Sequence, residues 1–119
     1  MDLGSAEAVR SFVPDLTAIA RLGPVGLVVT GADAEEASAD FVSRYFAPGA
    51  GIPEDPVTGS IHATLVPYWA AKLGRDRLMA FQASVRGGWL DCELSKERVL
   101  LSGNAVTFME ATIFMPEAA

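Results

Sequence analysis

Apolar residues along this chain fall into short blocks that predict strands, with one long apolar block that predicts a helix. Residues 25–30 form a continuous β-branched run, which is typical of a buried strand. Residues 40–46 alternate well enough for a second strand, and the small, acidic residues 31–39 between the two runs predict a loop or turn. Further strand-like runs with short turns follow at residues 77–84, 88–94, 98–103 and 104–115.

Three helices are expected between these runs. Ser5 can cap a short first helix, and Pro14-Asp15 can start a second one after it. The longest block, residues 60–74, begins at Ser60 or Thr58 and can end at Gly74.

The long helix suggests the architecture. Its residues from Ile61 to Leu73 leave almost no polar face, and a helix that is apolar all round is usually buried. We therefore expect one α+β domain over residues 1–119, in which a mostly antiparallel, curled sheet wraps around this central apolar helix.

A loop rich in proline and glycine precedes the helix. Residues 47–60, APGAGIPEDPVTGS, contain three prolines and three glycines. Such a composition argues against a helix or a regular strand and predicts a shaped loop. Loops held on a rigid scaffold often carry function, so this stretch is the first place to look for a site.

Composition narrows the classes of partner. The chain carries 15 acidic and 9 basic residues, a formal charge of −6, which argues against binding to nucleic acid or to an anionic membrane surface. No apolar stretch approaches the roughly 20 residues needed to span a bilayer. Cys92 is the single cysteine, so an internal disulfide is excluded, and a cytoplasmic location fits.

The junction between loop and helix is the best candidate site. Gly59 lets the backbone approach a ligand closely, and the free N–H groups at the start of the helix would favour a carboxylate or phosphate. Ser60 adds a hydroxyl donor, and Asp55 could be an acid, a base or a hydrogen-bond acceptor. The alternative is that Asp55 and Ser60 only organise a turn and cap the helix.

A second group of polar residues alternates on one predicted strand. Gln82, Ser84 and Arg86 could present an amide, a hydroxyl and a guanidinium on one face. Arg86 could hold a substrate carboxylate, or it could pair internally with Asp55 or Glu54. The same two alternatives apply to Arg44.

Neither His62 nor Cys92 points clearly to chemistry. His62, the only histidine, fits a packed and hydrogen-bonded core residue better than a proton shuttle. Cys92 lies between Asp91 and Glu93, whose charges would oppose a nucleophilic thiolate. The spacing of histidine, cysteine and carboxylates shows no metal-ligand pattern, so no metal site is predicted.

Taken together, these motifs resemble those in the C-terminal half of the PhzF-like (phenazine biosynthesis-like) isomerases. The motifs that carry the resemblance are Arg44-Tyr45-Phe46-Ala47-Pro48, Gly51-Ile52-Pro53-Glu54-Asp55-Pro56-Val57-Thr58-Gly59-Ser60, His62, Pro67-Tyr68-Trp69-Ala70, Gln82-Ala83-Ser84-Val85-Arg86-Gly87-Gly88 and Gly103-Asn104-Ala105-Val106.

The resemblance implies a fold like that of the diaminopimelate epimerases. In that fold two similar domains each wrap a sheet around a helix, and the active site lies between them. It implies cofactor-independent isomerisation by proton transfer, with Asp55 contacting a small aromatic or cyclic carboxylate and Gly59 and Ser60 binding it. The family's catalytic glutamate and its partnering histidine belong to the N-terminal domain, so neither Glu54 nor His62 corresponds to them.

Three readings of function follow from this resemblance. The chain is one domain of an isomerase that is inactive alone, or a half that self-associates, or a binding module without enzymatic activity. A symmetric homodimer would bring two copies of the loop containing Asp55 and Ser60 together, and two facing carboxylates can divide acid and base roles. The expected partners are therefore a small carboxylate and either a second copy or the missing N-terminal half.

Overall fold

The computed structural model describes residues 1–33 and 38–118 as an α+β fold with one main helix. The strands are β1 (Asp2–Ser5), β2 (Leu27–Ala32), β3 (Phe41–Ala47), β4 (Ile52–Asp55), β5 (Arg77–Gln82), β6 (Gly88–Ser95) and β7 (Arg98–Ser102). The helices are α1 (Ala6–Ser11), α2 (Leu16–Ala20), the 3-10 turn η1 (Pro48–Ala50) and the main helix α3 (Gly59–Leu73).

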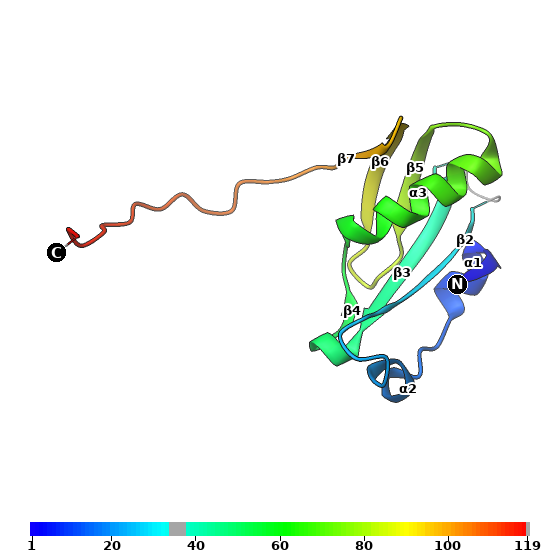
Figure 1. The fold of residues 1–119 in the computed structure, drawn as a ribbon, viewed down its shortest axis with the longest axis horizontal. Helices are drawn as coiled ribbons and strands as arrows, with labels where there is room; N and C mark the ends of the chain where they lie inside the picture. The colour runs from blue at the N-terminus through cyan, green and yellow to red at the C-terminus, as the bar shows by residue number, and fades with distance from the viewer. Residues whose placement is uncertain (34–37, 119) are drawn as a thin grey trace.

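All seven strands belong to one mixed sheet. Its order is β1-β2-β3-β5-β6-β7, and β4 pairs with β3 beside this path. The β1–β2 and β3–β5 pairs are parallel, and the other four pairs are antiparallel. The parallel β3–β5 pair is closed by the crossover through α3, which therefore lies across the sheet (Figure 1).

The sheet separates two apolar cores because neighbouring residues of a strand face opposite sides. On one face α3 packs around Phe41, and the Trp69 ring stacks on the Phe41 ring with centroids 5.6 Å apart. On the other face α1 and α2 bring Val9 and Ile19 against Val42. The two short helices and the long one thus cover opposite faces of the same sheet.

The prediction that α3 is buried all round is wrong. Its buried residues, His62, Leu65, Val66, Trp69 and Ala70, repeat at the spacing of a single helical face. The opposite face is exposed, but it carries residues such as Ala63, Pro67 and Ala71 that look apolar in the sequence. The helix therefore covers the sheet as a layer, and its outer face is open.

Local capping explains where the helices begin and end. The Ser5 side chain accepts a hydrogen bond from the Ala8 N–H, and the Asp15 side chain accepts one from the Ala18 N–H, as predicted for α1 and α2. Gly74 ends α3 in the left-handed conformation that favours glycine, with φ of 69°. Residues 34–37 of the predicted 31–39 loop lie outside the described residues, and β2 extends through Ala32.

Residues 47–60 are more regular than the sequence predicted. Pro48 begins the η1 turn, and residues 52–55 form β4, whose Pro53 is tolerated because β4 lies off the main path of the sheet. The expectation of neither helix nor strand in this loop is therefore wrong at these two short elements.

The last predicted strand is absent. Residues 103–118 have no regular secondary structure and leave the body as an extended tail (Figure 1). Their apolar side chains are almost fully exposed, with Phe108 97% exposed and Phe114 91% exposed. The prediction of a strand over residues 104–115 is therefore wrong for this chain, because none of the described elements pairs with or covers this segment.

The Thr30 hydroxyl links the helix to the sheet and can be tested. It donates to the Val42 carbonyl at 2.8 Å and accepts from the Trp69 Nε1–H at 3.0 Å, within the core. We expect Thr30→Val to lower the free energy of unfolding by about 1–3 kcal/mol in urea titrations, because the buried indole N–H loses its acceptor. Thr64→Val, on the exposed face of α3, is the matched control and should change the free energy of unfolding by less than about 0.5 kcal/mol.

Candidate functional site

The turn that starts α3 is held by its own side chains. Thr58 is the residue before the helix, but its hydroxyl does not cap the helix. The hydroxyl donates instead to the Asp55 carboxylate, three residues earlier. Asp55 therefore organises the turn, which was one of the two roles considered from the sequence. Its other carboxylate oxygen makes no hydrogen bond with the described residues.

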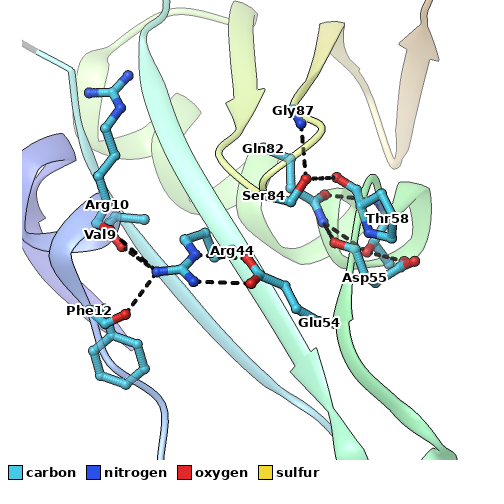
Figure 2. Close-up of polar contacts among 11 residues, drawn as sticks. Val9, Arg10, Phe12, Arg44, Glu54, Asp55, Thr58, Gln82, Ser84 and Gly87 are labelled. Carbon is cyan, nitrogen blue, oxygen red and sulfur yellow. Dashed lines mark hydrogen bonds and ion pairs between the residues drawn. The ribbon is translucent and has the colours of Figure 1, made fainter.

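Gln82, the last residue of β5, and Ser84, just after that strand, hold the same turn (Figure 2). The Gln82 amide is fully buried; its oxygen accepts from the Thr58 N–H at 2.7 Å, and its nitrogen donates to the Asp55 carbonyl at 2.9 Å. The Ser84 hydroxyl donates to the Pro56 carbonyl at 2.7 Å and accepts from the Gly87 N–H at 3.1 Å. Both side chains therefore hydrogen-bond within the protein, and their role in this structure is to position the turn.

The start of α3 is left without a cap. No side-chain hydrogen bond caps the helix at Thr58, so the first backbone N–H groups of α3 have no side-chain partner among the described residues. Unpaired N–H groups at a helix start carry a partial positive charge and attract anions. Ser60 is exposed, and its hydroxyl makes no hydrogen bond with the described residues, so the end of the helix is accessible.

A cavity of about 530 Å³ lies beside this helix end. Its wall combines the loop before α3, the β5–β6 turn and the residues after β7. The lining residues are Val57, Gly59, Arg86, Gly87, Gly88, Trp89, Leu90, Leu101, Ser102, Gly103 and Asn104. Gly88 is required there, because a Cβ at this position would lie 2.1 Å from a Val57 methyl group.

The two candidate arginines have different roles. Arg44 forms a double hydrogen bond with the Glu54 carboxylate, from Nε at 2.8 Å and Nη2 at 3.0 Å (Figure 2). Its Nη1 donates to the Phe12 carbonyl at 2.8 Å, at the end of α1. Arg44 therefore ties α1 to β4 and is structural. Arg86 forms no ion pair with any described residue, so its guanidinium is free to bind an anion.

His62 is a core residue, as the sequence favoured. Its ring is fully buried, and Nδ1 lies 2.7 Å from the Thr58 carbonyl, so Nδ1 carries the hydrogen and Nε2 is unprotonated. Burial lowers the pKa of His62 below its ordinary value of 6.5, against the opposing effect of the hydrogen bond to Thr58. Nε2 and the buried Ser43 hydroxyl have no hydrogen-bond partner among the described residues.

Cys92 is buried, and the described residues form no metal-ligand cluster. Cys92 is fully buried in the α3 core, and burial, assisted by the Asp91 charge, raises its thiol pKa to about 11. Among residues 1–33 and 38–118, no group of three or more His, Cys, Asp or Glu side chains could hold a metal ion. No helix within these residues is long and apolar enough to cross a membrane.

The structure brings only some of the predicted site residues to the cavity. Gly59 and Arg86 line it, whereas Gln82 and Asp55 are not among its lining residues and hold the turn before α3. Sequence reasoning missed Trp89 and Asn104 in the cavity wall. The signal that could have found them was the pair of glycine-containing breaks, at residues 86–88 and 102–104, next to which they lie.

These features define a class of protein. It is an α+β domain in which the uncapped start of the main helix and an unpaired arginine lie at the same open cavity. The family model for phenazine biosynthesis-like proteins matches residues 1–111. The chain belongs to this PhzF family.

Curated relatives support the assignment. The Pseudomonas aeruginosa protein named uncharacterized isomerase PA3578 is 52% identical over 104 residues, which are 87% of this chain and 39% of that protein. The mouse phenazine biosynthesis-like domain-containing protein 2 is 43% identical over 117 residues, which are 94% of this chain and 41% of that protein. This chain therefore spans about two fifths of the length of the curated relatives it matches.

Solved structures agree in fold. The Enterococcus faecalis PhzF-family protein superimposes with a TM-score of 0.82 at 44% identity, over 91% of this chain and 41% of that one. A putative PhzC/PhzF protein from Clostridium difficile gives a TM-score of 0.81 at 41% identity, over 97% of this chain and 44% of that one. The chain thus has the fold of one part of these larger proteins.

Removing the Gln82 amide tests whether it holds the turn before α3. Gln82→Leu keeps the size of the side chain but leaves the Thr58 N–H and the Asp55 carbonyl without partners. We expect the free energy of unfolding to fall by about 2–4 kcal/mol in urea titrations, the cost of two buried unpaired groups. A fall below 1 kcal/mol would show that the turn is held without Gln82.

The pH dependence of stability tests the burial of neutral His62. Because its pKa is lower in the folded chain, its contribution is complete above pH 6.5 and is lost as the pH falls below 6.5, where the unfolded chain takes up the proton first. Between pH 7.5 and 5.5, His62→Phe should therefore lose less unfolding free energy than the natural sequence, by up to about 1.4 kcal/mol per pH unit. Equal losses in the two proteins would contradict the assignment.

Proposed function

We propose that this chain supplies the carboxylate-binding part of a PhzF-like, cofactor-independent isomerase acting on a small aromatic or cyclic carboxylate. The observation that carries the proposal is the cavity where the uncapped start of α3 and the free Arg86 side chain meet. The names of relatives such as PA3578, an uncharacterized isomerase, support the reaction class without naming a substrate.

The chemistry of the cavity suits a flat anion. The helix start contributes about half a positive charge, and Arg86 contributes a full one that can bind both oxygens of a carboxylate. Val57, Trp89 and Leu101 give the rest of the wall an apolar character suited to a ring. A small carboxylate attached to a ring would satisfy both parts of the wall.

Proton transfer needs an acid or base, and the lining residues of the cavity provide neither a carboxylate nor a histidine. One oxygen of Asp55 accepts a hydrogen bond from the Thr58 hydroxyl. The family resemblance implies a glutamate base in the other domain. We therefore propose that catalysis requires a second protein surface, either the complementary part of the fold or a second copy of this chain facing the cavity with its own Asp55.

The lack of an acid or base in the cavity wall also favours a second candidate, a carboxylate-binding module without catalysis. Deuterium exchange separates the two. An isomerase would exchange a carbon-bound hydrogen of its ligand in deuterated water once the second surface is present, and a binding module would bind the same ligand without exchange. Light scattering over a dilution series shows whether a second copy supplies that surface.

Binding of 2-aminobenzoate tests the proposed anion site. We expect the backbone amide signals of Gly59 and Gly88 in NMR spectra to shift on titration into the full chain. Arg86→Met should weaken binding by about 10- to 100-fold, because it removes a charge-assisted hydrogen bond of about 1.5–3 kcal/mol.

Two controls give this test its meaning. Arg77→Met removes an exposed arginine that lies 3.6 Å from Glu93, away from the cavity, and should leave binding unchanged. The neutral analogue 2-aminobenzamide should bind much more weakly than 2-aminobenzoate. Equal binding of both ligands, or equal affinity in Arg86→Met and the natural sequence, would exclude Arg86 as the carboxylate-binding residue.

A further inference from the structure

The core between α3 and the sheet contains two polar atoms that the fold leaves unpaired. The Ser43 hydroxyl and His62 Nε2 both belong to fully buried side chains, and neither atom has a hydrogen-bond partner among the described residues. Nearly all buried polar groups in native proteins hydrogen-bond to protein or to water, so two unpaired groups in one core call for a partner.

The pairing of the strands places the Ser43 side chain on the face of the sheet that α3 covers. Ser43 is directly opposite Thr30 of β2 and Gln82 of β5, and such opposite residues present their side chains on one face. The Thr30 hydroxyl accepts a hydrogen bond from the Trp69 indole, and the Gln82 amide accepts one from the Thr58 N–H. Ser43 therefore lies in the sheet between the contact with Trp69 and the contact with the start of the helix.

His62 occupies the matching place on the helix. It lies about one turn after Thr58 and about two turns before Trp69, on the same buried face of α3. Its ring lies 6.1 Å from the Phe41 ring, centroid to centroid, and Phe41 is two residues before Ser43 on the same side of β3. The Ser43 hydroxyl and His62 Nε2 therefore lie in the same region of the core.

The two atoms are complementary, but they do not bond to each other in this structure. His62 Nδ1 donates to the Thr58 carbonyl at 2.7 Å, so Nε2 can only accept, whereas the Ser43 hydroxyl has a hydrogen to donate. One water molecule can accept from the hydroxyl and donate to Nε2. Its second hydrogen has acceptors nearby, because the Thr30 hydroxyl and the Gln82 carbonyl each keep a lone pair beside the one in use. Three hydrogen bonds are typical of a buried water.

We propose that one water molecule is bound in the core between the Ser43 hydroxyl and His62 Nε2, and that this bridged pair positions the start of α3. The Ser43 hydroxyl orients the water, and the water donates to Nε2. Because Nε2 is then an acceptor, the ring hydrogen stays on Nδ1, where it holds the Thr58 carbonyl. Ser43 and His62 are thus positioning residues that act through Thr58.

Thr58 connects this water site to the cavity. Its N–H bonds to Gln82, its hydroxyl to Asp55 and its carbonyl to His62. The next residue, Gly59, lines the cavity. With all three polar groups of Thr58 held, the orientation of the peptide that carries the Gly59 N–H is set from the core. The expected effect on ligand affinity rests on the proposed function, whereas the water site itself does not.

NMR spectra of the full chain without ligand test the water site. His62 is the only histidine, so its ring signals are unambiguous. We expect the ring protons to show a cross-peak to a long-lived water, and the ring nitrogens to show a protonated Nδ1 and a hydrogen-bonded, unprotonated Nε2. The absence of a water contact at the ring, or a protonated Nε2, would overturn the proposal.

Ser43→Thr and Ser43→Val form a matched pair, because the two variants have nearly the same side-chain shape and only the first keeps the hydroxyl. We expect Ser43→Thr to retain the water cross-peak and the Nε2 shift of the natural chain. Ser43→Val should lose both and should move the amide signals of Thr58 and Gly59. Equal ring and amide spectra in the two variants would contradict the role of the Ser43 hydroxyl.

Titration with 2-aminobenzoate extends the comparison to the ligand site. Affinity should be about 2- to 10-fold weaker in Ser43→Val than in Ser43→Thr, the effect of one lost hydrogen bond. Equal affinities would show that the bridged pair does not position the anion site. The spectra without ligand decide the water site, so failure of the natural chain to bind 2-aminobenzoate would count against the proposed function alone.

Discussion

The hydrogen bonds of the Gln82 amide are the constraint on which the site depends. Parallel pairing places Gln82 of β5 opposite Ser43 of β3, with its side chain under the turn that starts α3. A fully buried amide must satisfy both its oxygen and its nitrogen, and here the Thr58 N–H and the Asp55 carbonyl are its partners. These hydrogen bonds fix the position of the helix start relative to the sheet. They therefore also fix the position of the cavity wall that the helix start forms.

The loop before α3 is fixed at both ends by different chemistry (Figure 2). Arg44 and Glu54 form the ion pair at its β4 end, where the guanidinium also binds carbonyls at the end of α1. Gln82 and Ser84 hold its other end through neutral hydrogen bonds. Because these side chains are already paired within the protein, the groups left for an anion include the N–H groups of the helix start, the Ser60 hydroxyl and the Arg86 guanidinium.

Local signals in the sequence predicted the elements well, and tertiary contacts decided the rest. Ser5, Asp15 and Gly74 mark helix ends through interactions within a few residues, so the sequence was sufficient for them. Arg44 and Arg86 look alike in sequence, and only the folded chain shows that one is paired with Glu54 and the other is free. The exposed face of α3 was missed because alanine and proline do not distinguish a solvent face from a buried one.

The missing last strand has a different cause. Residues 104–115 have the apolar pattern of a strand, but no strand of the described residues pairs with them. A strand has no stable hydrogen-bonded structure without a partner, whatever its residue preference. The tail therefore stays extended, with Phe108 and Phe114 in water. The tail leaves the body at Gly103 and Asn104, which line the cavity.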